Sequence, residues 1–533
     1  MNSRPVDIAS ARRFNRRGVL QAGMGLGALA AFGRIPAEHM ALAAPALQAT
    51  PAAGGALVAA ASGDLQFDPY YRVTAAWFPM GTMYNALYDY SDPNSPGPVP
   101  SLAESDEETD TELTVKLKQG VMFHNGRELM AQDVVDNIER AKDESIGHFL
   151  TSYFGPTVES AEVVDDYTVK ITYTKPYALK RDDLATLFLL PKEAMADIAT
   201  TPVGTGPFSF VSYAPGDHLE LARFDDYFLD GQPLLDNVNV RILPDPQARV
   251  ANLLSGDVNV SEGIAESDIS RLEEDPAAKV AQSPLGGYWH TVVFNTERPA
   301  LENKLVRQAL NYSLDRDKIS QLAWFGLAPV TQGRYTPDNF WYHEPAATMY
   351  SFDLEKAKAL LAEAGLADGF TTTISVSEAN RPGSKALAQV WAQDLATIGI
   401  TLEIIEKEQN AFYDDYFSED YDIQVYLLGD GLFDPATAIN DSSPLRPEEN
   451  RANIQTQPFF EEYKKLVEDG VSTIDPEQRK PIYDRIQEIW AEESWSPILA
   501  FSLITVGLSE NVDGFALPPG GGYELAEASF AAD

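Results

Sequence analysis

The sequence predicts an α/β protein of several domains, and three observations carry that prediction. The chain has 533 residues, which corresponds to two to four domains at roughly 100 to 200 residues each. Hydrophobic residues make up 44 per cent and aromatic residues 10 per cent of the chain, an ordinary globular composition. In the second half, helical and strand-like patterns follow one another, as they do in an α/β lobe.

The folded part is expected to begin with a buried strand at residues 56–62. The preceding segment 44–55 is rich in Ala, Pro and Gly, which is typical of a flexible tether. Hydrophobic and polar residues then alternate at 113–117 and again at 167–173, which predicts two half-buried strands. Residues 133–143 between them carry apolar side chains at helical spacing, which predicts a helix.

Helix and strand patterns alternate in the second half of the chain. Residues 383–398 predict a helix, 400–405 a strand and 423–428 a second, more apolar strand. Another helix is expected between Asp353 and Gly365, because an aspartate is a favoured N-cap and a glycine a favoured C-cap.

The first 43 residues differ from the rest of the chain in charge. They carry six arginines against two acidic residues, whereas the whole chain has a net charge of −40. The apolar stretch 18–33 is shorter than the ~20 residues that span a bilayer, and residues 41–43 (Ala-Leu-Ala) form a candidate cleavage site. Arg16 and Arg17 resemble the pair of the twin-arginine export motif. We expect a cleaved twin-arginine signal at 1–43 and a periplasmic mature chain, with a general secretory signal as the alternative.

Charge and cysteine content exclude several classes of function. The chain has 80 acidic and 40 basic residues, so it would repel nucleic acid and anionic membrane surfaces. It has no cysteine, which excludes disulfides, thiolate metal sites, a cysteine nucleophile and a lipid anchor on cysteine.

The usual signatures of catalysis are missing. Neither Gly-x-Ser-x-Gly, the Walker loop, His-Glu-x-x-His nor the EF-hand spacing occurs after residue 43, and the histidines stand singly rather than at metal-ligand spacing. The carboxylates at 104–112 and 414–415 lack a periodic apolar partner and are expected to form solvated faces. We therefore expect a non-enzyme without cofactor or metal. The alternatives are an exported hydrolase that uses these carboxylates and a signalling or structural protein.

Six fragments stand in a fixed order along the mature chain: PSLAE at 100–104, GVMFHNG at 120–126, AQDVV at 131–135, PVGTGPF at 202–208, VRQALNYSLDR at 306–316 and KAKALLAEAG at 356–365. In this order they resemble the dipeptide, oligopeptide and nickel substrate-binding proteins of ABC importers, solute-binding protein family 5. The resemblance implies a periplasmic-binding-protein type II-like fold with two lobes, an extra domain, mixed sheets and crossing hinge segments. It also implies a monomeric receptor that binds a short peptide or amino-acid-like ligand between its lobes and delivers it to permease subunits.

The same resemblance implies a domain division. Domain I would comprise residues 56–90, 201–295 and 500–533, domain II residues 91–200, and domain III residues 296–499.

Two of the fragments are expected to be structural rather than ligand-binding. The glycines of 204–207 (Gly-Thr-Gly-Pro) suit a tight turn between crossing strands better than a phosphate cradle. Arg307 and Arg316 lie among apolar residues at helical spacing, and we expect them to form ion pairs at a lobe surface.

Ligand-binding residues are expected in loops at the ends of predicted elements. Asp430 lies in a glycine-flanked loop after the strand 423–428, and by resemblance it matches the aspartate that holds a peptide's α-ammonium group. Arg381, by resemblance, matches the arginine that receives the ligand carboxylate, which a guanidinium can meet with two parallel hydrogen bonds. Trp289 and Phe433 are aromatic candidates for the walls of the cleft.

Leu427 departs from the family pattern. Peptide-binding relatives commonly carry Trp before the Gly-Asp pair, so a flat aromatic wall is missing here. The chemical class of the ligand is therefore not decided by these residues. A short peptide would use both Asp430 and Arg381. An opine or sugar acid would use Arg381, whereas a cationic amine would use Asp430 with an aromatic cage.

Overall fold

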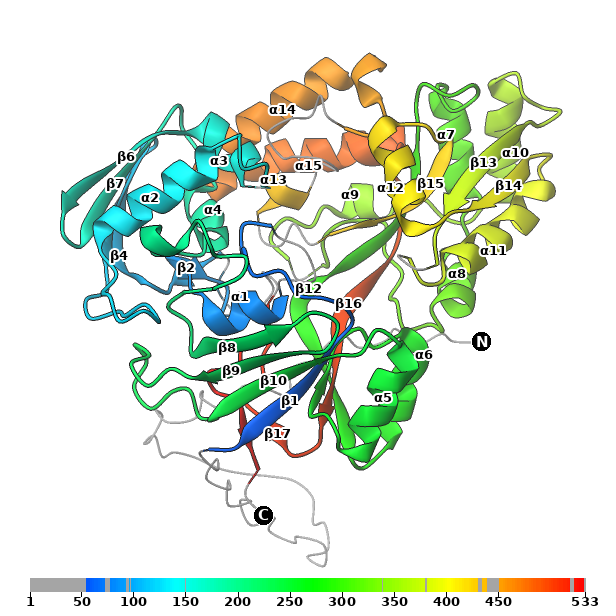
Figure 1. The fold of residues 1–533 in the computed structure, drawn as a ribbon. Helices are drawn as coiled ribbons and strands as arrows, with labels where there is room; N and C mark the ends of the chain where they lie inside the picture. Colours follow the sequence, from blue (N-terminus) through cyan, green and yellow to red (C-terminus); the bar gives the residue numbers. More distant parts are fainter. Residues whose placement is uncertain are drawn as a thin grey trace, which may run out of the picture.

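The computed structural model describes residues 54–71, 77–92, 95, 97–148, 150–337, 339–378, 381–429, 434–438, 450–517 and 522–531. The chain is a mixed α/β protein in which several sheets are combined with helices, as the sequence predicts (Figure 1). The expected signal segment 1–43 lies outside the described residues. None of the helices in the described part is both long and apolar enough to span a membrane.

A mixed sheet of ten strands is the central element of the fold. Its strands lie side by side in the order β14 (Thr401–Glu406), β13 (Thr371–Val376), β15 (Ile423–Leu428), β12 (Ala278–Phe294), β16 (Ile498–Ser509), β11 (Val260–Ser261), β1 (Ala56–Ala61), β10 (Asn237–Ile242), β9 (His218–Arg223) and β8 (Phe208–Ala214). The two long strands β12 and β16 pair antiparallel along most of their length. They run through the middle of the molecule and connect its two halves (Figure 1).

A separate four-stranded antiparallel sheet has the order β4 (Ala103–Glu108), β5 (Glu112–Leu117), β7 (Thr168–Tyr173) and β6 (Val158–Asp165). Leu113, Val115 and Leu117 of β5 are fully buried, which confirms the strand that their alternation predicts. The predicted helix between β5 and β7 is α2 (Ala131–Lys142), whose apolar side chains are buried beside this sheet.

The remaining helices surround the sheets. They are α1 (Trp77–Met83), α3 (Thr151–Thr157), α4 (Lys180–Thr186), α5 (Pro246–Ser255), α6 (Glu266–Glu274), α7 (Lys304–Tyr312), α8 (Arg316–Ala323), α9 (Glu344–Ala347), α10 (Leu354–Glu363), α11 (Ser384–Ala396), α12 (Gln409–Ser418), α13 (Pro435–Ala438), α14 (Phe460–Ser472) and α15 (Pro476–Glu493). Two short ladders complete the fold: β2 (Tyr88–Asp89) with β3 (Val99–Pro100), and β17 (Val512–Asp513) with β18 (Ser529–Phe530).

The capping residues that the sequence singles out do cap a helix. The side chain of Asp353 accepts a hydrogen bond of 2.9 Å from the backbone N–H of Lys356 at the start of α10. Gly365 follows the end of α10 with φ of +80°, a left-handed conformation that glycine adopts without steric cost. The predicted helix between these two residues is confirmed.

The sheet around β12 and β15 separates two cores. Val292 and Phe294 pack in one core with Ile423 and Val425, together with residues of α7, α8, α10 and α11. Trp289, Val293 and Leu428 belong to the other core, which extends to α12, α14 and α15. Successive side chains of a strand point to opposite faces, so this alternation decides which residues face which core.

Arg307 and Arg316 are buried, which corrects the expectation that they lie at a lobe surface. Arg307 is 0% and Arg316 6% exposed. Arg307 contacts a carboxylate oxygen of Glu493 at 3.3 Å, whereas Arg316 donates to the carbonyl of Ile498 at 2.8 Å. Chain segments that are distant in sequence cover α7 and α8 and satisfy these guanidinium groups with backbone carbonyls, which helical periodicity alone does not reveal.

The acidic segment 104–112 is only partly the solvated face that the sequence predicts. Asp106 accepts from Arg181 at 2.5 Å, and Glu108 accepts from Lys180 at 2.9 Å. The Asp106 side chain is only 12% exposed, so this end of β4 is an ion-paired contact with α4.

The glycines of 204–207 allow close packing against α1. The Gly206 N–H donates to the Met83 carbonyl at 3.0 Å. A Cβ on Gly204 would lie 2.1 Å from the Met83 carbonyl oxygen, far inside van der Waals contact. Close approach of two backbones, rather than a left-handed torsion, therefore requires glycine here.

The three-domain division stays a prediction.

Candidate ligand-binding site

Trp289 is a covered residue in the centre of the large sheet. It lies on β12, opposite Leu428 of β15 and Phe501 of β16. Its ring centroid is 4.7 Å from that of Phe501, and the residue is only 8% exposed. The tryptophan is therefore largely covered by its neighbours.

Arg334 covers the Trp289 ring. Its Cζ lies 4.5 Å from the ring centroid, within the range of a cation–π contact. Its Nη2 is 3.5 Å from the carbonyl oxygen of Gly429, the residue that follows β15. Although charged, Arg334 is only 7% exposed. Sequence reasoning misses Arg334, because it stands alone in a loop and no motif marks it.

Arg381 lies over two tyrosines next to this contact. Its Cζ is 5.2 Å from the Tyr426 ring and 5.7 Å from the Tyr413 ring. Its Nη2 also lies 3.3 Å from the Tyr413 hydroxyl. Tyr426 belongs to β15 and Tyr413 to α12, so a strand and a helix together orient the predicted carboxylate receptor.

The two arginines stand on neighbouring rings of one sheet face. Trp289 is opposite Leu428, and Tyr426 is opposite Thr291, so Trp289 and Tyr426 are diagonal neighbours on the same face. The structure thus brings together Trp289 and Arg381, which the sequence singles out, with Arg334, which it does not. We call Trp289, Arg334, Arg381, Tyr413 and Tyr426 the arginine–aromatic platform.

His290 packs on the opposite face of β12. Its ring centroid is 3.9 Å from that of Trp324, and its Nε2 is 2.7 Å from Ser502 Oγ. Burial, and then the positive charge of Arg381, lower the pKa of His290 to about 3. The imidazole is therefore neutral at neutral pH.

This pKa predicts that acid destabilises the protein partly through His290. An unfolded histidine titrates near 6.5, so below that pH the unfolded state binds a proton that the folded state excludes. Above about pH 6.5 the neutral His290 causes no loss in the free energy of unfolding. As the pH falls from 6.5 toward 3, the free energy of unfolding decreases, and this decrease reaches roughly 2 kcal/mol at pH 5. Urea unfolding of the parent and His290→Gln proteins at pH 7.5 and 5.0 measures the difference. His124 also has a low pKa, but it is present in both proteins, so its contribution cancels in the comparison. Equal losses in the two proteins would therefore contradict the prediction for His290.

Asp430 and Phe433 lie outside the described residues, so their roles stay predictions. Asp434, just beyond them, is described and holds a buried ion pair. Its two carboxylate oxygens accept from Arg479 of α15 at 2.5 and 2.7 Å. Burial and then the charge of Asp434 raise the pKa of Asp182 on α4 to about 7. Asp182 thus lies within electrostatic reach of Asp434. Asp434 itself directly precedes α13 and pairs with α15.

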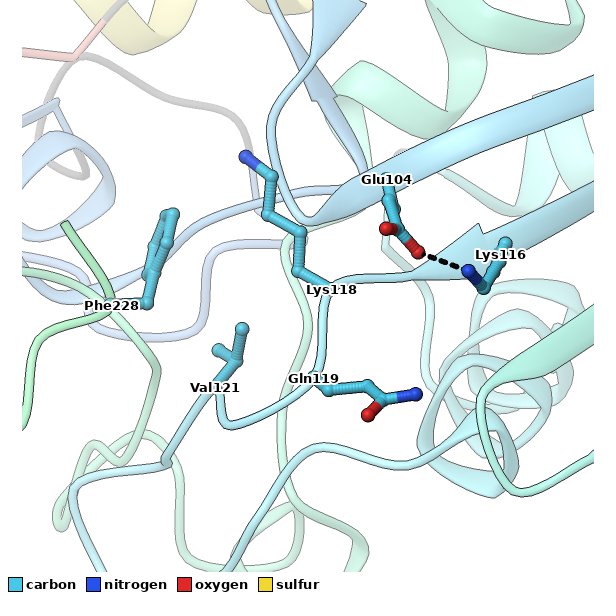
Figure 2. Close-up of a pocket in the computed structure, with 6 residues that line it drawn as sticks. All are labelled: Glu104, Lys116, Lys118, Gln119, Val121 and Phe228. Carbon is cyan, nitrogen blue, oxygen red and sulfur yellow. Dashed lines mark ion pairs between the residues drawn. The ribbon is translucent and has the colours of Figure 1, made fainter.

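Two surface hollows lie away from the platform. The first, of about 390 Å³, is lined by Glu104, Lys116, Lys118, Gln119, Val121 and Phe228 (Figure 2). Its ion pair between Glu104 and Lys116, at 2.6 Å, is half exposed and such pairs contribute little to stability. The second, of about 370 Å³, lies beside α1 and β2. Neither includes a predicted ligand-binding residue. In the described part of the chain, no cluster of three His, Asp or Glu side chains is arranged to hold a metal ion.

Comparison with known proteins gives consistent matches. Residues 97–444 match the family "Bacterial extracellular solute-binding proteins, family 5 Middle". The chain is 28% identical to the glutathione-binding protein GsiB of Salmonella typhi, over 78% of this chain and 82% of that protein. It is 29% identical to heme-binding protein A of Haemophilus influenzae, over 82% of this chain and 85% of that protein.

A solved structure shows the same fold. The periplasmic binding protein AgaA of A. tumefaciens R10, in complex with agropinic acid, superposes with a TM-score of 0.76 at 25% identity. The match covers 90% of this chain and 99% of AgaA. The fold, the six sequence fragments and the family match over residues 97–444 agree. This chain belongs to family 5 of the bacterial extracellular solute-binding proteins, the substrate-binding proteins of ABC importers.

Proposed function

We propose that this protein binds a short peptide or amino-acid-like ligand at the arginine–aromatic platform, between two lobes, and delivers it to an ABC permease. The observation that carries the proposal is the pair of guanidinium groups on neighbouring rings at the carboxyl end of β15. A guanidinium is always charged and offers a planar fork of donors, which suits a carboxylate. GsiB and AgaA, named for glutathione and agropinic acid, support a ligand with carboxylate groups.

The proposed roles follow from chemistry. Arg381, oriented by Tyr413 and Tyr426, receives a carboxylate of the ligand. Asp430 accepts from its ammonium group, which brings three donors and needs a charged acceptor when desolvated. Phe433 forms an apolar wall. Trp289 acts mainly by supporting Arg334, because its own ring is largely covered.

Other ligands of the same receptor class use subsets of these residues. An opine or sugar acid would engage Arg381, whereas a cationic amine would engage Asp430. The geometry around Arg381 and Arg334 favours an anionic group. A hydrolase would convert its ligand, whereas the proposed receptor, which has no catalytic turnover, returns it unchanged.

Recovery of the ligand tests this function. Mass spectrometry of small molecules released from gently purified protein is expected to identify an unmodified amino-acid-like compound. Adding this compound back is expected to reduce the radius of gyration of a monomer in small-angle scattering, because the closed lobes gain contacts that exist only with ligand. A chemically altered product would favour the hydrolase, and an unchanged scattering profile at saturation would exclude lobe closure.

We also propose that the protein reaches the periplasm by twin-arginine export, with loss of residues 1–43. Replacing Arg16 and Arg17 by lysine is expected to leave the precursor in the cytoplasm, because that route reads the arginine pair. Cell fractionation and immunoblotting measure the distribution, and a lysine pair introduced at Arg12 and Arg13 is the control. Normal export of the Arg16→Lys/Arg17→Lys precursor would point to the general secretory route.

A further inference from the structure

We propose that Arg334 is a second anion-binding residue and that the ligand carries two carboxylate groups, one for each arginine of the platform. The inference rests on the proposed function and narrows its ligand class. It points to peptides with an acidic side chain or to dicarboxylic amino-acid conjugates.

The placement of the two arginines on separate rings supports this class. Arg334 lies 4.5 Å from the Trp289 ring and Arg381 lies 5.2 Å from the Tyr426 ring. Diagonal neighbours on a sheet face lie roughly 7 to 8 Å apart. The two guanidinium groups thus stand on separate rings of the same sheet face. Two anionic groups of one small molecule can therefore meet them separately.

Electrostatics points the same way. Both cations lie at the end of β15, and the charge of Arg381 contributes to the low pKa of His290 on the other face. Arg334 is only 7% exposed, and a guanidinium that has lost hydration is stabilised by hydrogen bonds to a carboxylate. A ligand with two carboxylates can form such hydrogen bonds with both arginines, whereas a ligand with one carboxylate can form them with only one.

Two isosteric dipeptides test the inference. Ala-Glu and Ala-Gln have the same shape and differ by one carboxylate; reduced glutathione is a second probe with two carboxylates. In titration calorimetry, the parent protein is expected to bind Ala-Glu or glutathione at least tenfold more tightly than Ala-Gln. Arg334→Gln is expected to abolish this preference, measured as the ratio of the two dissociation constants in the same variant. Arg485→Gln, which replaces a partly exposed arginine on α15 outside the platform, is the control.

A purely structural role for Arg334 would not change selectivity between isosteres. If Arg334→Gln keeps the parent's preference, or if the parent has none, the inference is wrong. Should Arg334→Gln fail to fold, Arg334→Lys retains the charge without the planar fork and is expected to reduce the preference at least threefold. An unchanged preference in that variant would also overturn the inference.

The outcomes also separate this inference from the proposed function. Loss of affinity for all three probes in Arg381→Gln, with an unchanged preference in Arg334→Gln, would overturn only the role of Arg334. Failure of the parent to bind any probe would overturn the ligand class of both proposals.

Discussion

Replacing Arg381 by Gln, or Asp430 by Asn, is expected to weaken binding of the recovered ligand by roughly a hundredfold or more. Each substitution removes one partner of a desolvated ion pair and leaves the opposite charge buried, which costs roughly 3 to 5 kcal/mol. For Arg381 the structure adds a reason, because Tyr413 and Tyr426 already orient the guanidinium. Titration calorimetry of folded variants measures the change.

Matched controls separate this site from surface charge. Asp420→Asn and Arg485→Gln remove charges whose side chains are 80% and 36% exposed, and such surface ion pairs contribute about 0 to 1 kcal/mol. Affinity within threefold of the parent in both Arg381→Gln and Asp430→Asn would reject the proposed site. Loss in the Asp430 variant alone would favour a cationic amine, and loss in the Arg381 variant alone an anion without an ammonium group.

Arg479→Gln is expected to lower the free energy of unfolding by roughly 3 to 5 kcal/mol, because it leaves Asp434 buried without its partner. The Arg479 side chain is 4% and that of Asp434 10% exposed. Arg479 also donates to the Gly470 carbonyl at 2.8 Å, so it connects the end of the segment after β15 to α14 and α15. Equilibrium unfolding in urea measures the loss.

A double substitution checks the cause. Asp434→Leu with Arg479→Met removes both charges, and replacing a buried ion pair by apolar residues is often neutral or stabilising. The double variant is therefore expected to be more stable than Arg479→Gln. Arg485→Gln on the same helix should cost at most about 1 kcal/mol. If the double variant were as unstable as the single one, packing rather than the unpaired charge would explain the loss.

The sequence predicts those elements that depend on local chemistry. Alternation at 113–117 and 167–173 predicts strands β5 and β7 because one face of each strand must be buried. Asp353 and Gly365 delimit α10 because an unsatisfied N–H and a left-handed turn each need a particular residue type. Family membership likewise follows from the order of short fragments, which is a property of the sequence itself.

The surroundings of single side chains depend on contacts between distant segments. Helical spacing places Arg307 and Arg316 on α7 and α8, but only the segments around Glu493 and Ile498 bury them. Arg334 has no motif around it and becomes a candidate only because its loop covers Trp289.

By itself, then, the sequence determines the fold class, the family and Arg381 as a candidate carboxylate receptor. The tertiary structure alone decides that Arg381 and Arg334 stand on neighbouring rings. The physical reason is strand register: the pairing of Trp289 with Leu428 and of Thr291 with Tyr426 sets one face of the sheet, and a slip by one residue would turn these rings away. Such register results from hydrogen bonding and burial between strands far apart in the chain, which no local pattern encodes.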